Sequence, residues 1–93
     1  MVLMANNDVR QRVFEREFLP ELGALYGFAF HLTYDEAAAE DLVQDTIERA
    51  IKAIDQYRQG TNAKAWLFKI MRNHFINGYR KKSRRPSMVD YED

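Results

Sequence analysis

Apolar residues recur at helical spacing along most of this 93-residue chain, and no stretch keeps the apolar–polar alternation of a strand. The pattern predicts three helical blocks, at residues 8–32, 36–54 and 63–82, separated by short polar segments. Asp8 is the predicted N-cap of the first block, and Pro20 should kink or divide that block because proline lacks an N–H donor. The expected fold is all-α, a compact bundle of three main helices.

The second and third blocks each begin after residues that favour a helix start. Asp35 or Thr33 is the expected cap of the second block, and Thr61 or Asn62 is the expected cap of the third. The segment between the two blocks is a polar loop that contains one glycine, Gly60.

Helical periodicity gives the second block an apolar side and a polar side. The predicted core side consists of Ala39, Val43, Thr46, Ile47, Ala50 and Ile54. The polar side consists of Asp41, Gln44, Asp45, Glu48 and Lys52, with Glu40 nearby. An acidic side of this kind is either ordinary solvated surface or a docking surface for a basic partner, and its sequence leaves both open. No histidine stands at metal-ligand spacing from these acids, so no metal site is predicted there.

The third block places a more unusual set of side chains on one stripe. The predicted core side consists of Leu67, Ile70, Met71, His74 and Phe75. The stripe consists of Asn62, Trp66, Lys69, Asn73, Asn77 and Arg80. Amides and arginine can bond to base edges, cations can bond to phosphates, and an aromatic ring can stack on an unpaired base. The stripe therefore indicates a surface that binds melted or single-stranded DNA. In the alternative interpretation, Trp66 is a core anchor and the amides have no such role.

Charge is distributed unevenly, although the formal net charge is zero. Residues 1–57 carry five basic and eleven acidic side chains, a net charge of −6. Residues 58–85 carry nine basic side chains and no acid, whereas residues 86–93 carry three acids. A segment such as 58–85, with many cations and no carboxylate, is typical of one that attracts a polyanion.

Composition narrows the function classes further. A chain of this length, 46% hydrophobic and 30% charged, is expected to form one globular domain with a core at about residues 8–82 and a mobile charged tail at 83–93. The absence of cysteine excludes disulfides, a thiol nucleophile and a cysteine-type zinc site. No apolar run is long enough for a membrane span, so we expect a soluble cytoplasmic protein without membrane contact. His31 and His74 are interpreted as packed side chains, and no catalytic motif or cofactor-binding motif is present, which favours a role other than catalysis.

Three strings, in this order and spacing, resemble the promoter-binding domain (region two) of bacterial sigma factors of the extracytoplasmic-function group. Residues 39–46, AEDLVQDT, resemble the polymerase-binding helix of that family. Residues 60–70, GTNAKAWLFKI, resemble its DNA-melting segment. Arg72-Asn73 followed by residues 76–82, INGYRKK, resembles its minus-ten recognition helix.

The resemblance implies a division of roles among these positions. The residues expected to contact the clamp helices of the largest catalytic subunit of core RNA polymerase are Asp41, Gln44, Asp45 and Glu48. The residues expected to contact the non-template strand of the minus-ten element are Tyr57, Arg58, Asn62, Lys64, Trp66, Lys69, Arg72, Asn73, Asn77, Arg80 and Lys81. The loop from Tyr57 to Asn62, together with Lys64 and Trp66, is expected to receive an unstacked non-template base.

The resemblance also implies an anti-sigma factor as a partner and a second domain, a helix-turn-helix that recognises the minus-thirty-five element. These 93 residues contain no such second domain, so promoter initiation by this chain alone is not expected. An alternative from another class stays open, in which the chain is a helical protein-interaction module without direct contact to DNA.

Overall fold

The structure is a computed structural model that describes the backbone of residues 2–84 and the side chains of residues 8–78. Within residues 2–84 the chain forms helices joined by turns and no strand, which confirms the predicted all-α bundle. The predicted tail at 83–93 lies outside the described residues, apart from its first two positions, which continue the last helix.

The first predicted block is one broken helical arm. It comprises helix α1 (Val2–Val13), the π-helical turn η1 (Phe14–Phe18), the 3₁₀ turn η2 (Leu19–Glu21) and helix α2 (Leu22–Thr33). The predicted break at Pro20 is confirmed, because η2 begins with Leu19-Pro20, where proline's missing N–H costs least. The predicted N-cap at Asp8 is wrong: α1 begins at Val2, and no proline or glycine precedes Asp8 to stop the helix.

Helix α3 (Glu36–Lys52) begins where the sequence indicates. The Asp35 carboxylate accepts a hydrogen bond from the Ala38 backbone N–H at 2.8 Å, so Asp35 is the cap. The alternative cap, Thr33, instead donates its hydroxyl to the Ala29 carbonyl. The helix ends two residues before the predicted end, and a short 3₁₀ turn η3 (Ile54–Gln56) follows.

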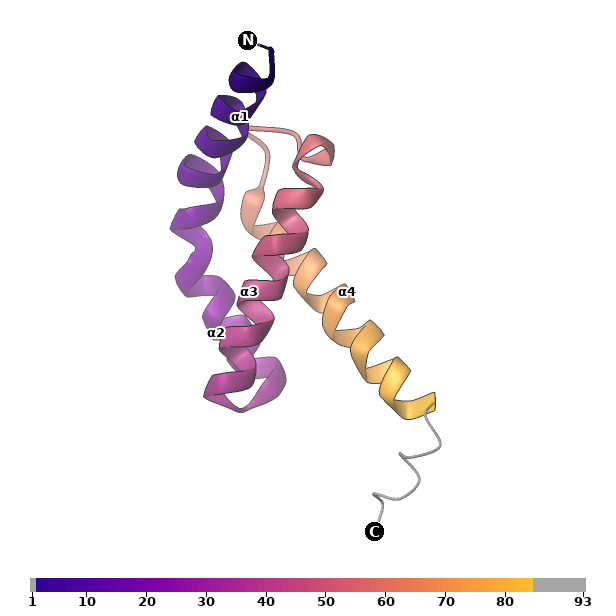
Figure 1. The fold of residues 1–93 in the computed structure, drawn as a ribbon. Coiled ribbons are helices and arrows are strands. Elements are labelled where there is room, and N and C mark those ends of the chain that lie inside the picture. The colour runs from indigo at the N-terminus through magenta and orange to yellow at the C-terminus, as the bar shows by residue number, and fades with distance from the viewer. Residues whose placement is uncertain (1, 85–93) are drawn as a thin grey trace.

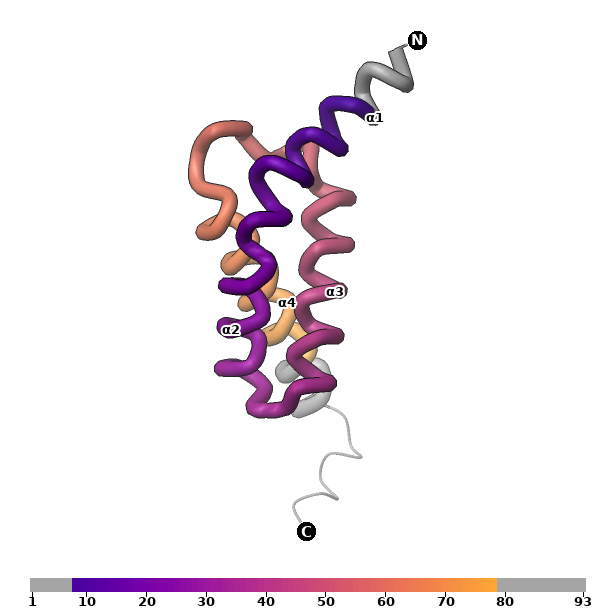
Figure 2. Tube along the Cα trace, turned by 90° about the vertical axis from the view of Figure 1, so that its left-hand side faces the viewer, coloured from indigo at the N-terminus to yellow at the C-terminus, as the bar shows by residue number. Residues whose placement is uncertain are grey.

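Helix α4 (Ala63–Arg84) follows the loop. Asn62 caps it, with its side-chain oxygen accepting from the Ala65 N–H at 3.0 Å. In Figure 1, α2 and α3 run antiparallel, and α4 crosses the pair obliquely; Figure 2, turned by 90°, shows α2 and α3 side by side with α4 on their far side.

The core forms where α2, α3, α4 and η1 meet. Its fully buried large side chains are Phe18, Leu25, Thr46, Leu67 and Met71. Of the core positions predicted for the second block, Ala39, Thr46 and Ala50 of α3 and Ile54 of η3 are buried, and Val43 and Ile47 are partly buried against them. Leu42, which the sequence analysis assigned to neither side, is also buried. Thr46 is the one buried polar side chain among the described residues, and its hydroxyl donates to the Leu42 carbonyl at 2.7 Å.

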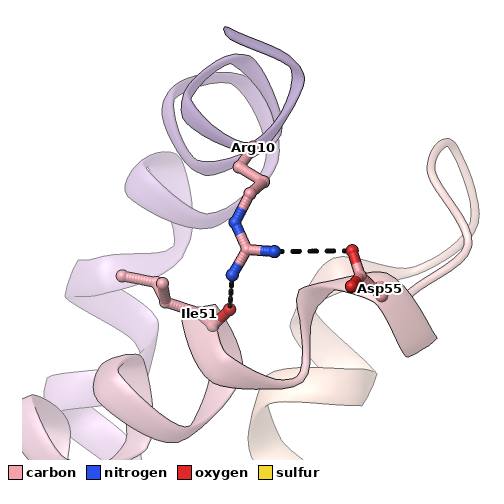
Figure 3. Close-up of polar contacts among 3 residues, drawn as sticks. All are labelled: Arg10, Ile51 and Asp55. Atoms are coloured by element: carbon pink, nitrogen blue, oxygen red, sulfur yellow. Dashed lines mark hydrogen bonds and ion pairs between the residues drawn. The ribbon is translucent and has the colours of Figure 1, made fainter. Parts of the chain in front are cut away.

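Among the described side chains, Arg10 makes the polar contacts between helix α1 and the end of α3, and Val13 of α1 packs into the core. Arg10 donates to the Ile51 carbonyl at 3.0 Å through one guanidinium nitrogen, and its other terminal nitrogen lies 3.5 Å from the Asp55 carboxylate (Figure 3). The carbonyl belongs to the last turn of α3, where backbone acceptors lack helical partners. This contact places α1 beside the loop that leads into α4 (Figure 1).

Candidate nucleic-acid interface

The stripe predicted on α4 lies on its solvent side in the described part of the chain. Lys69, Asn73 and Asn77 are exposed, as is the capping residue Asn62. The Asn62 side-chain oxygen is occupied by the cap, so only its NH₂ group is left to donate to a ligand. Arg80 and Lys81 belong to α4, but their side chains lie outside the described residues.

Trp66 combines the two roles that the sequence left open. Its ring stacks on the Phe18 ring, with the ring centroids 5.7 Å apart and an interplanar angle of 29°. The centroids of the Trp66 and Tyr57 rings are 4.9 Å apart. The residue is nonetheless only partly buried. Trp66 is therefore packed against the core and still partly exposed on the stripe.

Tyr57 corrects the expectation for the loop. Only 8% of the residue is exposed, and its ring packs edge-on against Phe18 at 5.4 Å. Its hydroxyl donates to the Glu17 carboxylate. Burial, and secondarily the bond to Glu17, raises the pKa of Tyr57 above its ordinary value. The side chain thus belongs to the core rather than to the surface that would receive a base, because Phe18 and Trp66 form an aromatic cluster that encloses it.

The loop between Tyr57 and α4 exposes its next four residues. Gly60 has a φ of +79°, a left-handed conformation that favours glycine. Thr61 closes the turn by donating its hydroxyl to the Arg58 carbonyl at 2.6 Å. Arg58 is exposed, so it remains at the surface where the sequence analysis expected a DNA contact.

The other predicted cations also lie at the surface. Lys64 in the first turn of α4 and Arg72 in its middle are exposed. Together with Arg58 and Lys69, they give four exposed cations on the loop and α4 among the described side chains. Long-range attraction to a polyanion requires cations of this kind.

The predicted polymerase-binding side of α3 is likewise exposed. Asp41, Gln44, Asp45 and Glu48 all lie on the solvent side of the helix. Within residues 8–78 the ion pair between permanently charged side chains is Arg10–Asp55, and the Asp45 carboxylate also contacts the His74 ring. Asp45 is therefore the member of the set that contacts α4, with its carboxylate 3.3 Å from the His74 ring. Asp41 and Glu48 have no basic partner among the described residues.

The histidines differ from one another. His74 is partly buried between α3 and α4, in line with the expected packed role. His31 is exposed near the end of α2, beside the Tyr34 ring at 6.1 Å, so the expectation of a packed side chain is wrong there. Among the described residues no group of three potential metal ligands comes together.

A groove between α3 and α4 brings two further cations, Arg49 and Lys52, beside the amides of the stripe. It has a volume of about 360 Å³, and its polar lining consists of Arg49, Lys52, Asn73, His74 and Asn77. Lys52 was expected on the polar side of the second block, and Arg49 was assigned to no surface. Their spacing of three residues places them on one side of α3, which was the available signal, but only the packing of α4 shows what they adjoin.

Comparison with known proteins identifies the family. The family described as Sigma-70 region 2 matches residues 18–85. The chain belongs to this family. The match begins at Phe18, so α1 and most of η1 of this region 2 chain lie before it, whereas the loop and α4 lie within it.

Several relatives of this region 2 chain are full sigma factors. The extracytoplasmic-function sigma factor EcfG of Rhodopseudomonas palustris is 40% identical over 74 residues, which cover 80% of this chain and 41% of the relative. SigM of Bacillus subtilis is 38% identical over 66 residues, which cover 71% of this chain and 40% of the relative. The chain thus spans about two fifths of the length of these relatives.

A solved structure supports the same fold. It is the sigma factor RpoE of Bartonella quintana in complex with the anti-sigma factor NepR, with a TM-score of 0.66 and 43% identity. The similarity covers 83% of this chain and 45% of that one. No helix of residues 2–84 has the length and apolar character needed to cross a membrane.

Proposed function

We propose that this region 2 chain binds core RNA polymerase and recognises and melts the promoter minus-ten element. One observation carries the proposal: a chain of this family displays an acidic side on α3 and an amide- and cation-bearing stripe on α4, both exposed. The role is positional rather than catalytic and uses no cofactor. Its site of action is the cytoplasm, where the polymerase works.

The acidic side of α3 is the proposed polymerase contact. Asp41, Gln44 and Glu48 present carboxylates and an amide without covering neighbours, and they suit a basic partner such as the clamp helices of the largest catalytic subunit. Complementary charge of this type contributes mainly to the rate and register of association. Asp45 lies at the boundary with α4, where its carboxylate contacts the His74 ring.

The loop and α4 form the proposed DNA surface. Exposed cations on the loop and helix bind phosphates, and the two amides Asn73 and Asn77 bond to base edges. The partly exposed Trp66 is the aromatic side chain on which an unpaired base stacks. Capturing one flipped base offsets the few kcal/mol that unstacking costs. The polymerase holds the domain at the promoter, so binding by the isolated chain is weak.

An anti-sigma factor is the proposed regulatory partner. The similar chain of Bartonella quintana is bound to the anti-sigma factor NepR. A protein that covered the α3 side or the α4 stripe would block the polymerase contact or the DNA contact. This observation also supports the second candidate, an interaction module that binds such a protein without contacting DNA.

Two pairs of substitutions distinguish the candidates. Asp41→Lys with Glu48→Lys should abolish binding to core polymerase while leaving affinity for a single-stranded minus-ten oligonucleotide equal or higher, since the change adds positive charge. Asn73→Ala with Asn77→Ala should reduce oligonucleotide affinity and leave polymerase binding intact. Asp45 is left unchanged in both variants because its carboxylate contacts His74, which lies beside the amides.

The matched control reverses two exposed acids on the N-terminal arm. Asp8→Lys with Glu15→Lys makes the same change in net charge and should leave polymerase binding intact. If the unaltered chain does not bind the oligonucleotide, either alone or together with polymerase, the result would favour the interaction module. Loss of both activities in either α3 or α4 variant, with the helical circular dichroism retained, would contradict the division into two surfaces.

A further inference from the structure

The Glu17 carboxylate connects η1 to the loop that precedes α4. It accepts the Tyr57 hydroxyl, and it accepts the Gly60 backbone N–H at 3.1 Å through one oxygen and at 3.3 Å through the other. Tyr57 and Gly60 follow Glu17 by 40 and 43 residues in the sequence. The contacts are therefore tertiary, and no local sequence pattern indicates them.

Glu17 is the main restraint on the shape of the loop. Among the described residues it is the one group outside residues 57–61 that forms a hydrogen bond to residues 58–61. The remaining bonds of this segment are internal, from Thr61 to the Arg58 carbonyl. Gly60 carries little conformational preference of its own, so the loop depends on Glu17 for its position.

The helix geometry around Glu17 supports the same role. Glu17 belongs to a π-helical turn, a form that occurs mostly as single turns and often at functional sites. The next residue, Phe18, is fully buried and stacks on Trp66. Two consecutive residues of η1 thus fix the loop and the tryptophan relative to each other.

The charge of Glu17 is opposite to what strand binding alone would favour. Residues 58–85 contain no carboxylate, and Glu17 introduces one within hydrogen-bond distance of this segment. A carboxylate near DNA phosphates repels them. Its electrostatic effect on strand affinity is therefore unfavourable, and its favourable contribution must come from geometry.

We propose that Glu17 is a positioning residue for strand capture, which holds residues 58–61 in the shape that receives an unstacked base. The inference rests on the proposed function, because it assigns a role within the same DNA surface. A loop held in its binding shape before the strand arrives loses less conformational freedom on binding. Removal of the carboxylate should therefore weaken capture of a base even though it removes a repulsive charge.

Amide hydrogen exchange in the 93-residue chain tests the contact directly. Glu17→Ala should accelerate exchange of the Gly60 amide about tenfold, since a hydrogen bond to a charged group is lost. Glu17→Gln should retain most of the protection, because its side-chain oxygen still accepts the bond. The amides of Leu67 and Met71 report whether the core stays folded, and Glu15→Ala, an exposed neighbour in the same turn, is the matched control. Unchanged Gly60 exchange in Glu17→Ala would overturn the proposal.

Binding of single-stranded DNA by the polymerase-bound chain tests the role. The probes are non-template oligonucleotides of a promoter that this complex transcribes, intact or with one abasic site at each position in turn. In Glu17→Ala, affinity for the intact strand should fall about three- to tenfold, and affinity for the strand that lacks the captured base should not fall. Glu17→Gln should bind the intact strand at least as tightly as the unaltered protein.

The outcomes separate this inference from the proposed function. Higher affinity for the intact strand in both Glu17→Ala and Glu17→Gln would show that Glu17 acts through charge alone, and would overturn the positioning role. If no abasic site weakens binding to the unaltered complex, base capture itself is refuted, and the role of Glu17 in it is refuted as well. If the same abasic site lowers affinity by an equal factor in Glu17→Ala and in the unaltered protein, only the positioning role of Glu17 is refuted, and base capture stands.

Discussion

Phe18 is the residue on which the aromatic cluster beneath the proposed DNA surface depends. It has no exposed surface, and it contacts Phe14, Tyr57 and Trp66 through its ring. Phe18→Ala leaves a cavity where three elements meet, so it should cost about 3–5 kcal/mol of unfolding free energy. A domain of this size has about 5–14 kcal/mol in total. The corresponding fall in Tm is roughly 15–30 °C.

The assay is urea unfolding, followed both by helical circular dichroism and by fluorescence of Trp66, the single tryptophan of the chain. Phe30→Ala is the matched control, because Phe30 is 39% exposed and its aromatic contact is an edge-on one to Tyr34. That change should cost no more than about 1.5 kcal/mol. Equal losses in the two variants would refute the account of the core beneath the DNA surface.

Two further predictions concern the helix cap and the buried tyrosine. Asp35→Ala removes the carboxylate that caps α3 and should cost about 1 kcal/mol in thermal or urea unfolding, whereas Asp8→Ala, inside α1, should cost less; equal effects would contradict the assigned cap. Burial and the bond to Glu17 raise the pKa of Tyr57 in the folded state. The protonated hydroxyl therefore stabilises the fold fully below the ordinary tyrosine pKa of 10.0, and this stabilisation is lost as the pH rises through the pKa of the folded state. Unfolding free energies measured between about pH 8 and pH 11 should fall less steeply in Tyr57→Phe, and an identical slope would contradict the assignment.

The sequence predicted what depends on helical periodicity and on local caps. The exposed acids of α3 and the stripe of Lys69, Asn73 and Asn77 follow directly from a repeat of 3.6 residues. The cap at Asp35 and the break at Pro20 follow from local backbone chemistry.

Features that depend on contacts between distant segments could not be predicted in this way. Tyr57 looks like a surface residue because it stands in a polar loop, and only the packing of η1 shows that Phe18 and Glu17 enclose it. The proximity of Arg49 to Asn77 likewise depends on the angle at which α4 crosses α3, which no single-helix pattern specifies.

The salt dependence of strand binding shows whether the loop and α4 bind DNA. The loop and α4 carry four exposed cations among the described side chains, Arg58, Lys64, Lys69 and Arg72. If each binds one phosphate of a single-stranded minus-ten oligonucleotide, the logarithm of the binding constant should fall with the logarithm of salt concentration with a slope of about −3. Lys69→Ala should make the slope shallower by about 0.7. A flat slope for the unaltered chain would show that this surface does not bind the strand.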